Sequence, residues 1–239
     1  MVPIFRSRAE VKPRLPIEVC EYIIDAIFDD RYRLAPASLD TLSSCALVCH
    51  AWCPRAQRVL FGYVILRDRE ALYRFSELLD ASPELASYVQ ILALRGNIHL
   101  AYSTAVLFPA VLRGRLINLQ SLYIDELDPE DRAARRPHNV DKELSTLPIH
   151  PYFPSLLSSI RIRRLDLTLT RFSSFADFAR ILNALSNLEE LCCERVSWSV
   201  FGREPLCMRA DLLHCSKNAF LPHINQLWVC THDYILKRR

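Results

Sequence analysis

Glycine is scarce in this chain of 239 residues, and its scarcity excludes several classes of enzyme. Only Gly62, Gly96, Gly114 and Gly202 occur, and no two of them lie within fifteen residues of each other. A phosphate-binding P-loop, a dinucleotide-binding fingerprint and the nucleophile elbow of a hydrolase each need at least two glycines within about six residues. None of these motifs can be written with the glycines present.

Long apolar runs and an excess of one charge are also missing. The longest apolar run, residues 105–112, is interrupted by Pro109, whereas a membrane-spanning helix needs about 18 apolar residues. The 30 basic and 27 acidic residues leave a net charge of only +3, which is too small to attract a polyanion. The sequence therefore predicts a soluble globular protein that binds neither a membrane nor nucleic acid.

The N-terminal residues do not read as an export signal. Arg6, Arg8 and Lys12 are not followed by the apolar segment of a secretory signal. Nine cysteines in a chain without such a signal indicate reduced thiols. We therefore expect the protein in the cytoplasm or the nucleus.

No sequence motif indicates a catalytic centre, a metal site or a cofactor site. The motifs HExxH and GxSxG are absent. Cys45, Cys49 and Cys53 are spaced four apart, so on one continuous helix their thiols would share a face, next to His50. Zinc sites need a second pair of ligands elsewhere, so we expect these cysteines to pack as small buried hydrophobic residues. The sequence thus predicts a protein that is not an enzyme and holds no cofactor.

The first quarter of the chain has the pattern of a small helical module. After a basic tail at residues 1–13, apolar residues at helical spacing predict a first helix over 16–28. Residues 29–38 break this period and predict a loop. A second helix is expected from Leu39, and a third one from Arg55 to Phe61.

The amino-acid sequence of this segment resembles the F-box and is similar to that of fungal F-box proteins. Three phrases occur in order: LPxE at Leu15, LVCxxW at Leu47 and LF at Leu60. The resemblance covers about residues 13–66, and it implies a three-helix module, over 14–66, that docks on the Skp adaptor of a cullin-based ubiquitin ligase complex. The loop at 29–38 is longer than the usual connection of the family. The resemblance assigns the adaptor contact to Leu15, Pro16, Val19, Ile23, Ile24, Leu47, Val48, Trp52 and Leu60.

Residues 67–239 contain a repeated phrase. Five segments share the template LxxLxL, which is the signature of a leucine-rich repeat, and they lie at 89–94, 119–124, 162–167, 188–193 and 224–229. Their start-to-start distances are 30, 43, 26 and 36 residues, whereas the repeat family runs from about 20 to 29. Helical periodicity between the phrases predicts strands joined by helices, with few tight hairpins. We expect the long insert at 128–154, which is rich in proline, to be a surface excursion.

In such a repeat the third, fifth and seventh positions of the phrase point away from the helices and line the exposed face of a sheet. This predicts a surface of mixed charge with two aromatic residues, which is typical of protein recognition. We expect Tyr123, Arg164 and Trp228 to bind a client protein. The full set is Ile91, Ala93, Arg95, Ser121, Tyr123, Asp125, Arg164, Asp166, Thr168, Glu190, Cys192, Glu194, Gln226, Trp228 and Cys230.

The sequence thus predicts an α/β protein with an N-terminal three-helix F-box-like module and an irregular leucine-rich-repeat-like solenoid. The function that follows is a substrate receptor, which docks the Skp adaptor through the F-box and a client protein through the repeats. The alternative is a leucine-rich-repeat scaffold for protein interaction that has no role in a ligase. An exposed apolar face on the helical module would favour docking over this alternative.

Overall fold

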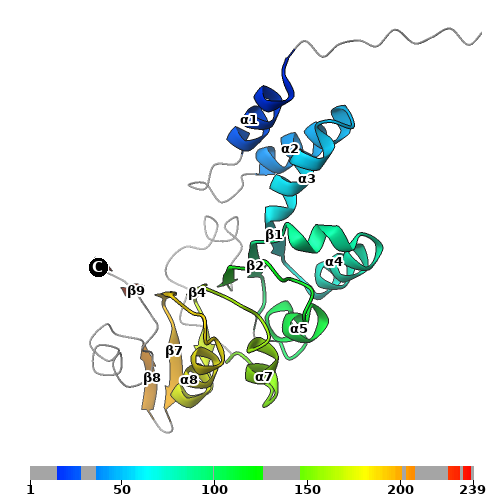
Figure 1. The fold of residues 1–239 in the computed structure, drawn as a ribbon. Helices are drawn as coiled ribbons and strands as arrows, with labels where there is room; N and C mark the ends of the chain where they lie inside the picture. The colour runs from blue at the N-terminus through cyan, green and yellow to red at the C-terminus, as the bar shows by residue number, and fades with distance from the viewer. Residues whose placement is uncertain are drawn as a thin grey trace, which may run out of the picture. The chain divides into compact units, whose positions relative to one another are not determined.

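The computed structural model describes residues 15–27, 36–98, 100–125, 146–200, 203–207, 226–231 and 234–237, and from Val200 onward only the backbone is considered. These residues form a mixed α/β protein with seven α-helices and a largely parallel sheet (Figure 1). The chain divides into two compact units, Met1–Leu60 and Phe61–Arg239. No helix in the described part of the chain has the length and apolar character needed to cross a membrane.

The helical unit consists of α1 (Ile17–Ile27), α2 (Pro36–Val48) and α3 (Cys53–Gly62), whose last residues lie past the division between the units. The predicted loop at 29–38 is too long, because residues 36–38 already belong to α2. Proline is tolerated in the first turn of a helix, where its missing N–H has no partner to lose. A hydrogen bond of 2.7 Å from Arg55 Nε to Asp25 Oδ1 joins α3 to α1.

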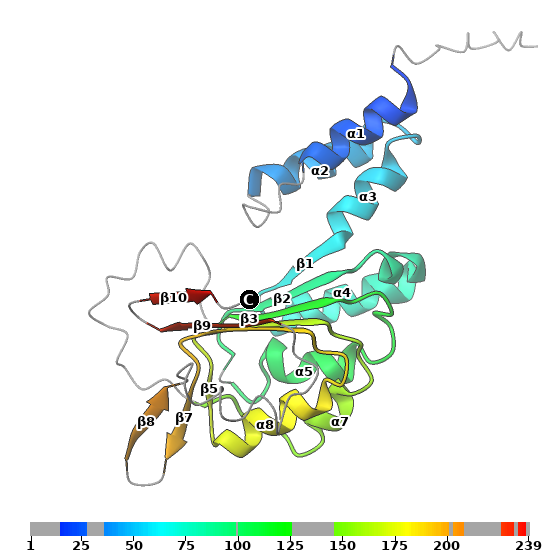
Figure 2. The ribbon, with the colours of Figure 1, turned by 60° about the vertical axis from the view of Figure 1, so that its left-hand side comes forward.

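The larger unit is built on a seven-stranded sheet with the strand order β1-β2-β3-β4-β6-β9-β10 (Figure 2). The first six strands of this order pair in parallel, and β10 pairs antiparallel with β9. The strands are β1 (Tyr63–Leu66), β2 (Ile91–Arg95), β3 (Ser121–Asp125), β4 (Arg164–Thr168), β6 (Glu190–Glu194), β9 (Gln226–Thr231) and β10 (Tyr234–Lys237).

Each of the five LxxLxL phrases contributes one strand, and the strands pair in the register of the template. Leu92, Leu122, Leu165, Leu191 and Leu227 occupy the same template position and form one row across the sheet. Strand β1 has no such phrase, and its residues were placed in the helical module by the sequence pattern. The division after Leu60 and the pairing of β1 with β2 place these residues with the sheet.

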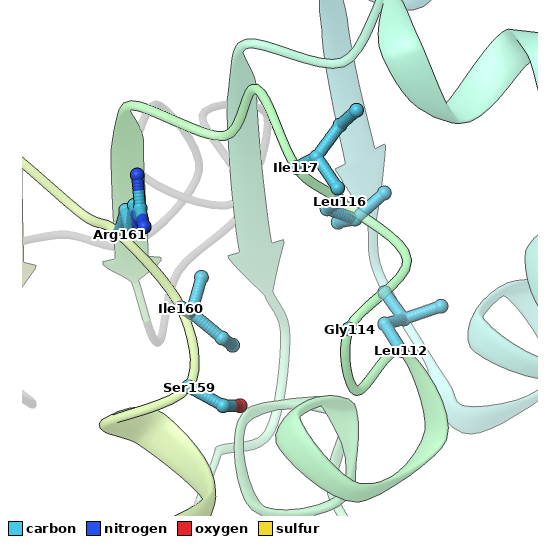
Figure 3. A pocket seen from close by; sticks show the side chains of 7 residues that line it. All are labelled: Leu112, Gly114, Leu116, Ile117, Ser159, Ile160 and Arg161. Carbon is cyan, nitrogen blue, oxygen red and sulfur yellow. The ribbon is translucent and has the colours of Figure 1, made fainter.

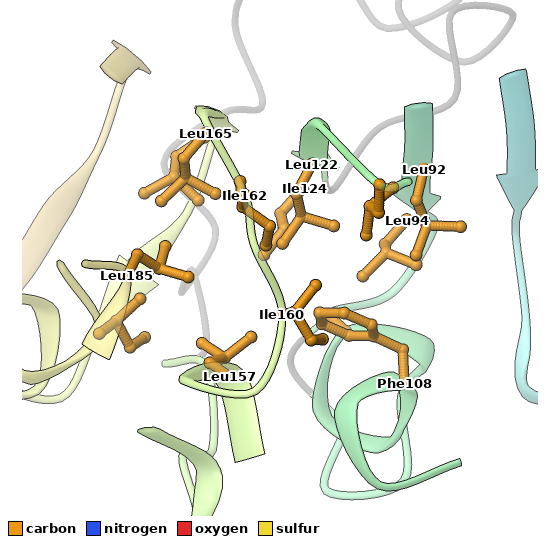
Figure 4. Close-up of a cluster of buried hydrophobic side chains, with 14 of the residues drawn as sticks. Leu92, Leu94, Phe108, Leu122, Ile124, Leu157, Ile160, Ile162, Leu165 and Leu185 are labelled. Carbon is orange, nitrogen blue, oxygen red and sulfur yellow. The ribbon is translucent and has the colours of Figure 1, made fainter. Parts of the chain in front are cut away.

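Helices connect the strands and pack on the template leucines. They are α4 (Arg69–Ala81), the 3-10 helix η2 (Pro83–Ser87), α5 (Thr104–Val111), α7 (Phe153–Leu157) and α8 (Phe175–Ala184). Asp68 caps α4 by accepting from Ala71 N–H at 2.7 Å, and Ser174 caps α8 by accepting from Asp177 N–H at 3.2 Å. Figure 4 shows the resulting core, in which strand leucines face Phe108 and residues of the connecting segments.

The insert expected at 128–154 is not wholly a surface excursion. Residues 126–145 lie outside the described part of the chain, but Leu147 is 1% exposed and forms a β-bridge with Phe172. Phe153 is also buried, and its ring lies 6.5 Å from that of Phe108. The end of this connection is buried because it supplies α7, which covers the sheet between α5 and α8.

Most strand pairs are parallel, as the expectation of few hairpins requires, but two are antiparallel. Strands β7 (Ser197–Val200) and β8 (Arg203–Cys207) pair antiparallel, and together with β5 (Arg171–Phe172) they form a second, three-stranded sheet. The antiparallel pair of β9 and β10 is a second case. Scarce glycine did not exclude such pairs, because each needs special backbone angles in only a few turn residues.

A left-handed residue follows the strand at equivalent positions of three repeats. Gly96, Leu169 and Arg195 each lie two residues beyond their phrase, and their φ angles are 98°, 54° and 55°. Only the first of them needs glycine for reasons of space, because a Cβ atom there would lie 2.4 Å from the carbonyl oxygen of Arg67. The turn therefore occurs in all three repeats, but in two of them the left-handed residue is not glycine, so the sequence does not indicate it.

Candidate binding surfaces

The helical unit buries few apolar side chains and exposes many. Among its described residues, the buried hydrophobic ones are Cys20, Ile24, Leu42 and Ala56. By contrast, Leu47 is 86% exposed, and further exposed large hydrophobic residues are Leu15, Ile17, Val19, Tyr22, Ile23 and Val48. We call this set the exposed apolar residues of the helical unit.

The pattern of α1 explains part of this exposure. Its apolar stripe is wider than the contact it makes, so Cys20 and Ile24 face the inside of the unit while Val19 and Ile23, 42% and 44% exposed, lie on the flank. Leu47 and Val48 form the end of α2, beyond the buried Leu42. Solvent-exposed aliphatic residues at such density are typical of an interaction surface.

The structure places the residues assigned to adaptor binding in three environments. Leu15, Pro16, Val19, Ile23, Leu47 and Val48 are exposed. Trp52 and Leu60 are half-buried, and Ile24 is fully buried. Ile24 therefore belongs to the packing of the helical unit itself, whereas the six exposed residues are accessible to a partner.

The row of cysteines is not on one helix. Helix α2 ends at Val48 and α3 begins at Cys53, so the three thiols do not share a helical face. Cys49 is exposed, and Cys45 and Cys53 are half-buried, so the expectation that these residues pack as core residues is wrong for Cys49. In the described residues no three His, Cys, Asp or Glu side chains are grouped so as to hold a metal ion.

The second candidate surface is the sheet face that points away from the template leucines. We expected its residues to be accessible, but Ala93, Arg95, Asp125, Asp166 and Thr168 are buried. Neighbouring strands lie only about 4.8 Å apart, so side chains in one row cover each other. Arg95 lies opposite Asp125 in the register, which pairs opposite charges across the strands.

Arg164 is the centre of the half-buried part of this face. Its Nη1 lies 3.2 Å from Glu190 Oε2, and its Nη2 lies 3.7 Å from Asp166 Oδ2. The guanidinium carbon lies 5.8 Å from the centre of the Tyr123 ring, at the distance of a cation–π contact. We call Tyr123, Arg164, Asp166 and Glu190 the polar sheet face.

Electrostatics keeps this guanidinium charged. Burial by itself lowers the pKa of Arg164, but the influence of Tyr123, Asp166 and Glu190 outweighs it and raises the pKa above the ordinary value. The Nε atom of Arg164 is buried and has no hydrogen-bond acceptor among the described residues. The cluster is therefore a permanently charged group held by two carboxylates and an aromatic ring.

The structure brings together two of the three residues assigned to client binding, Tyr123 and Arg164. Trp228 lies in β9, in the same cross-strand row as Tyr123 and Asp166, but its side chain lies outside the described part of the chain. The sequence analysis placed Glu190 on this face but did not predict its contact with Arg164. The signal was available in the template, because the two residues share its third position and lie opposite each other.

Comparison of the chain with models of protein families, with curated proteins and with solved structures gives no match. The class that the fold defines is a mixed α/β protein that joins a small helical unit to a unit with a parallel sheet.

Proposed function

We propose that the chain is the substrate-receptor subunit of an SCF-type ubiquitin ligase. Its F-box-like helices dock the Skp adaptor, and its leucine-rich-repeat-like region binds a client protein. The observation that carries this proposal is the exposure of aliphatic residues at F-box-like positions, above all Leu47 at 86% and Val48 at 61%. The phrases LPxE, LVCxxW and LF supply the resemblance that gives this surface its partner.

The arrangement of the repeats supports the second half of the proposal. The five phrases align in the register of their template, as the strands of a leucine-rich-repeat solenoid do. The polar sheet face presents Tyr123 and Arg164, which belong to residue types that are enriched at the centres of protein interfaces. We assign the client contact to these two residues and Trp228.

The work of such a receptor is proximity. Holding a client lysine beside a ubiquitin carrier raises its effective concentration to about the millimolar range, as for other tethered partners. This role needs no catalytic group in the chain itself. For this role we expect the protein in the cytoplasm or the nucleus, where its cysteines stay reduced.

Capture of the adaptor by the purified full chain tests the proposal. Leu47→Gln/Val48→Gln removes two aliphatic contacts that would each contribute about 1.5–3 kcal/mol on burial, so affinity for the Skp adaptor should fall at least about 100-fold. Glutamine suits a helix nearly as well as leucine, so α2 is preserved. Titration calorimetry measures the change.

The matched control is Ile117→Gln, which makes the same kind of change at a residue that is 71% exposed on the other unit. This variant should bind the adaptor like the unchanged chain. Unchanged adaptor binding by the Leu47→Gln/Val48→Gln variant, or no binding by the parent chain, would overturn the proposal.

The alternative is a repeat scaffold without a ligase role. It predicts that the helical module serves packing or dimerisation and that the purified chain does not bind the adaptor. A chain that binds a client through Tyr123 and Arg164 while failing to bind the adaptor would establish this alternative.

A further inference from the structure

A hollow of about 330 Å³ opens between two corresponding turns of neighbouring repeats. One wall is the turn that leads from α5 to β3, and the other is the segment that leads from α7 to β4 (Figure 3). This volume is at the lower end of the range of ligand pockets, so it suits one or two side chains rather than a whole domain. The lining residues are Leu112, Gly114, Leu116, Ile117, Ser159, Ile160 and Arg161.

Both walls of the hollow contain buried aliphatic residues, but these offer little surface to a ligand. Leu112 and Leu116 on one wall and Ile160 on the other are between 1% and 8% exposed. Ile117 is 71% exposed, which is unusual for isoleucine and leaves an aliphatic side chain in solvent beside the opening. An aliphatic side chain of a ligand in the hollow would bury apolar surface of Ile117.

The two turns are strongly basic. Residues 112–119 and 158–164 contain no aspartate or glutamate. Their arginines are Arg113, Arg115, Arg161, Arg163 and Arg164. Segments with this composition attract negative charge, although the chain as a whole is nearly neutral.

Neighbouring carboxylates neutralise some of these charges. Arg115 lies 2.8 Å from Asp80 on α4, and Arg163 lies 3.9 Å from Glu189. Arg164 lies beside Asp166 and Glu190, so three of the five arginines are held by the fold itself.

Arg113 and Arg161 are exposed, and neither makes an ion pair with a described residue. We propose that the hollow binds an acidic peptide segment of the client, with an aliphatic side chain between the two turns and flanking carboxylates on Arg113 and Arg161. The assignment rests on the proposed function only in calling this peptide a client. It adds a second contact, at the start of β3 and β4, to the one on the polar sheet face.

The exposed Ile117 beside the two arginines favours a peptide over the other anions. A free phosphate would gain nothing from Ile117, and two unpaired arginines are few for a nucleic acid. An acidic peptide with a leucine uses both features at once. Its carboxylates can form charge-assisted hydrogen bonds with guanidinium groups.

Fluorescence anisotropy of the purified full chain, without adaptor, tests the assignment. The probe is the labelled peptide Gly-Glu-Glu-Leu-Glu-Glu-Gly, and it is compared with versions in which glutamine replaces glutamate or glycine replaces leucine. We expect the first peptide to bind at least about tenfold tighter than either of the others. Its affinity should also fall as salt is raised.

Arg113→Gln/Arg161→Gln should weaken binding of the acidic peptide at least about tenfold. The control Arg69→Gln/Arg74→Gln removes two charges from α4 in the same unit and should leave the affinity unchanged. If the first variant is unstable, Ser159→Phe, which fills the hollow and keeps both arginines, should abolish binding instead.

Equal binding of the glutamine peptide, or unchanged binding by the arginine variant and by Ser159→Phe, would contradict the assignment. Displacement of the peptide by equimolar inorganic phosphate, or tighter binding of a single-stranded oligonucleotide, would also contradict it. The adaptor takes no part in this measurement, so a failure here and a failure of adaptor capture are distinguishable.

Discussion

The two units of this protein solve the burial of apolar residues in opposite ways. The larger unit places its template leucines and the phenylalanines of its helices in one continuous core. The helical unit buries only a few hydrophobic residues and leaves Leu47 and Val48 largely in solvent. Among the described residues, half of the exposed large hydrophobic side chains lie on this smaller unit. The comparison teaches that the larger unit buries its apolar side chains in its own core, whereas the smaller one leaves aliphatic side chains in solvent, as the proposed docking requires.

The contrast between the two units depends on the buried core of the larger unit being essential for its stability. Phe172 is fully buried, and its ring lies 5.2 Å from that of Phe178. We expect Phe172→Ala to lower the free energy of unfolding by about 3–5 kcal/mol, because it removes a large side chain from a close-packed site. Urea denaturation followed by circular dichroism measures this change.

Phe175→Ala is the control for this prediction. Phe175 lies on the same helical connection but is 38% exposed, so its removal should cost clearly less. Equal losses from the two substitutions would show that burial in this unit does not set its stability.

The sequence predicted most of this core because its signals are local. The phrase at 162–167 and the apolar spacing of α8 each lie within about a dozen residues, so their periods could be read directly. The template also predicted which residues of each strand share a face, since the leucines of one row must face one core.

Other features depend on partners that are distant in the chain. Strand β1 follows α3 without a break, and its apolar residues do not distinguish a strand from a helix. The burial of Asp166 depends on Tyr123 and Cys192, which lie opposite it on neighbouring strands and come from distant parts of the sequence. Leu169 and Arg195 adopt left-handed angles that only glycine or asparagine would have signalled.

A smaller effect is expected at the turn that the repeats share. Gly96→Ala should lower the free energy of unfolding by about 1–3 kcal/mol, because alanine is strained at a φ angle of 98° and its Cβ atom would lie 2.4 Å from a carbonyl oxygen. Gly114→Ala is the matched control, since Gly114 also has a positive φ but an added Cβ atom meets nothing within 4 Å. A greater loss at Gly114 in the same urea titration would rule out the close approach as the cause.

The smallest change in stability is expected for exposed residues of the helical unit, and it distinguishes a binding role from a structural one. Leu47→Gln/Val48→Gln should alter the free energy of unfolding by no more than about 0.5 kcal/mol, because both side chains lie mostly in water before and after the change. The same variant should lose adaptor binding by at least about 100-fold. A purely structural role of these residues predicts the reverse, namely a loss of stability with any change in binding following from unfolding. A stability loss of several kcal/mol in urea titration would therefore show that these residues hold the helical unit together, and would remove the contrast between the two units.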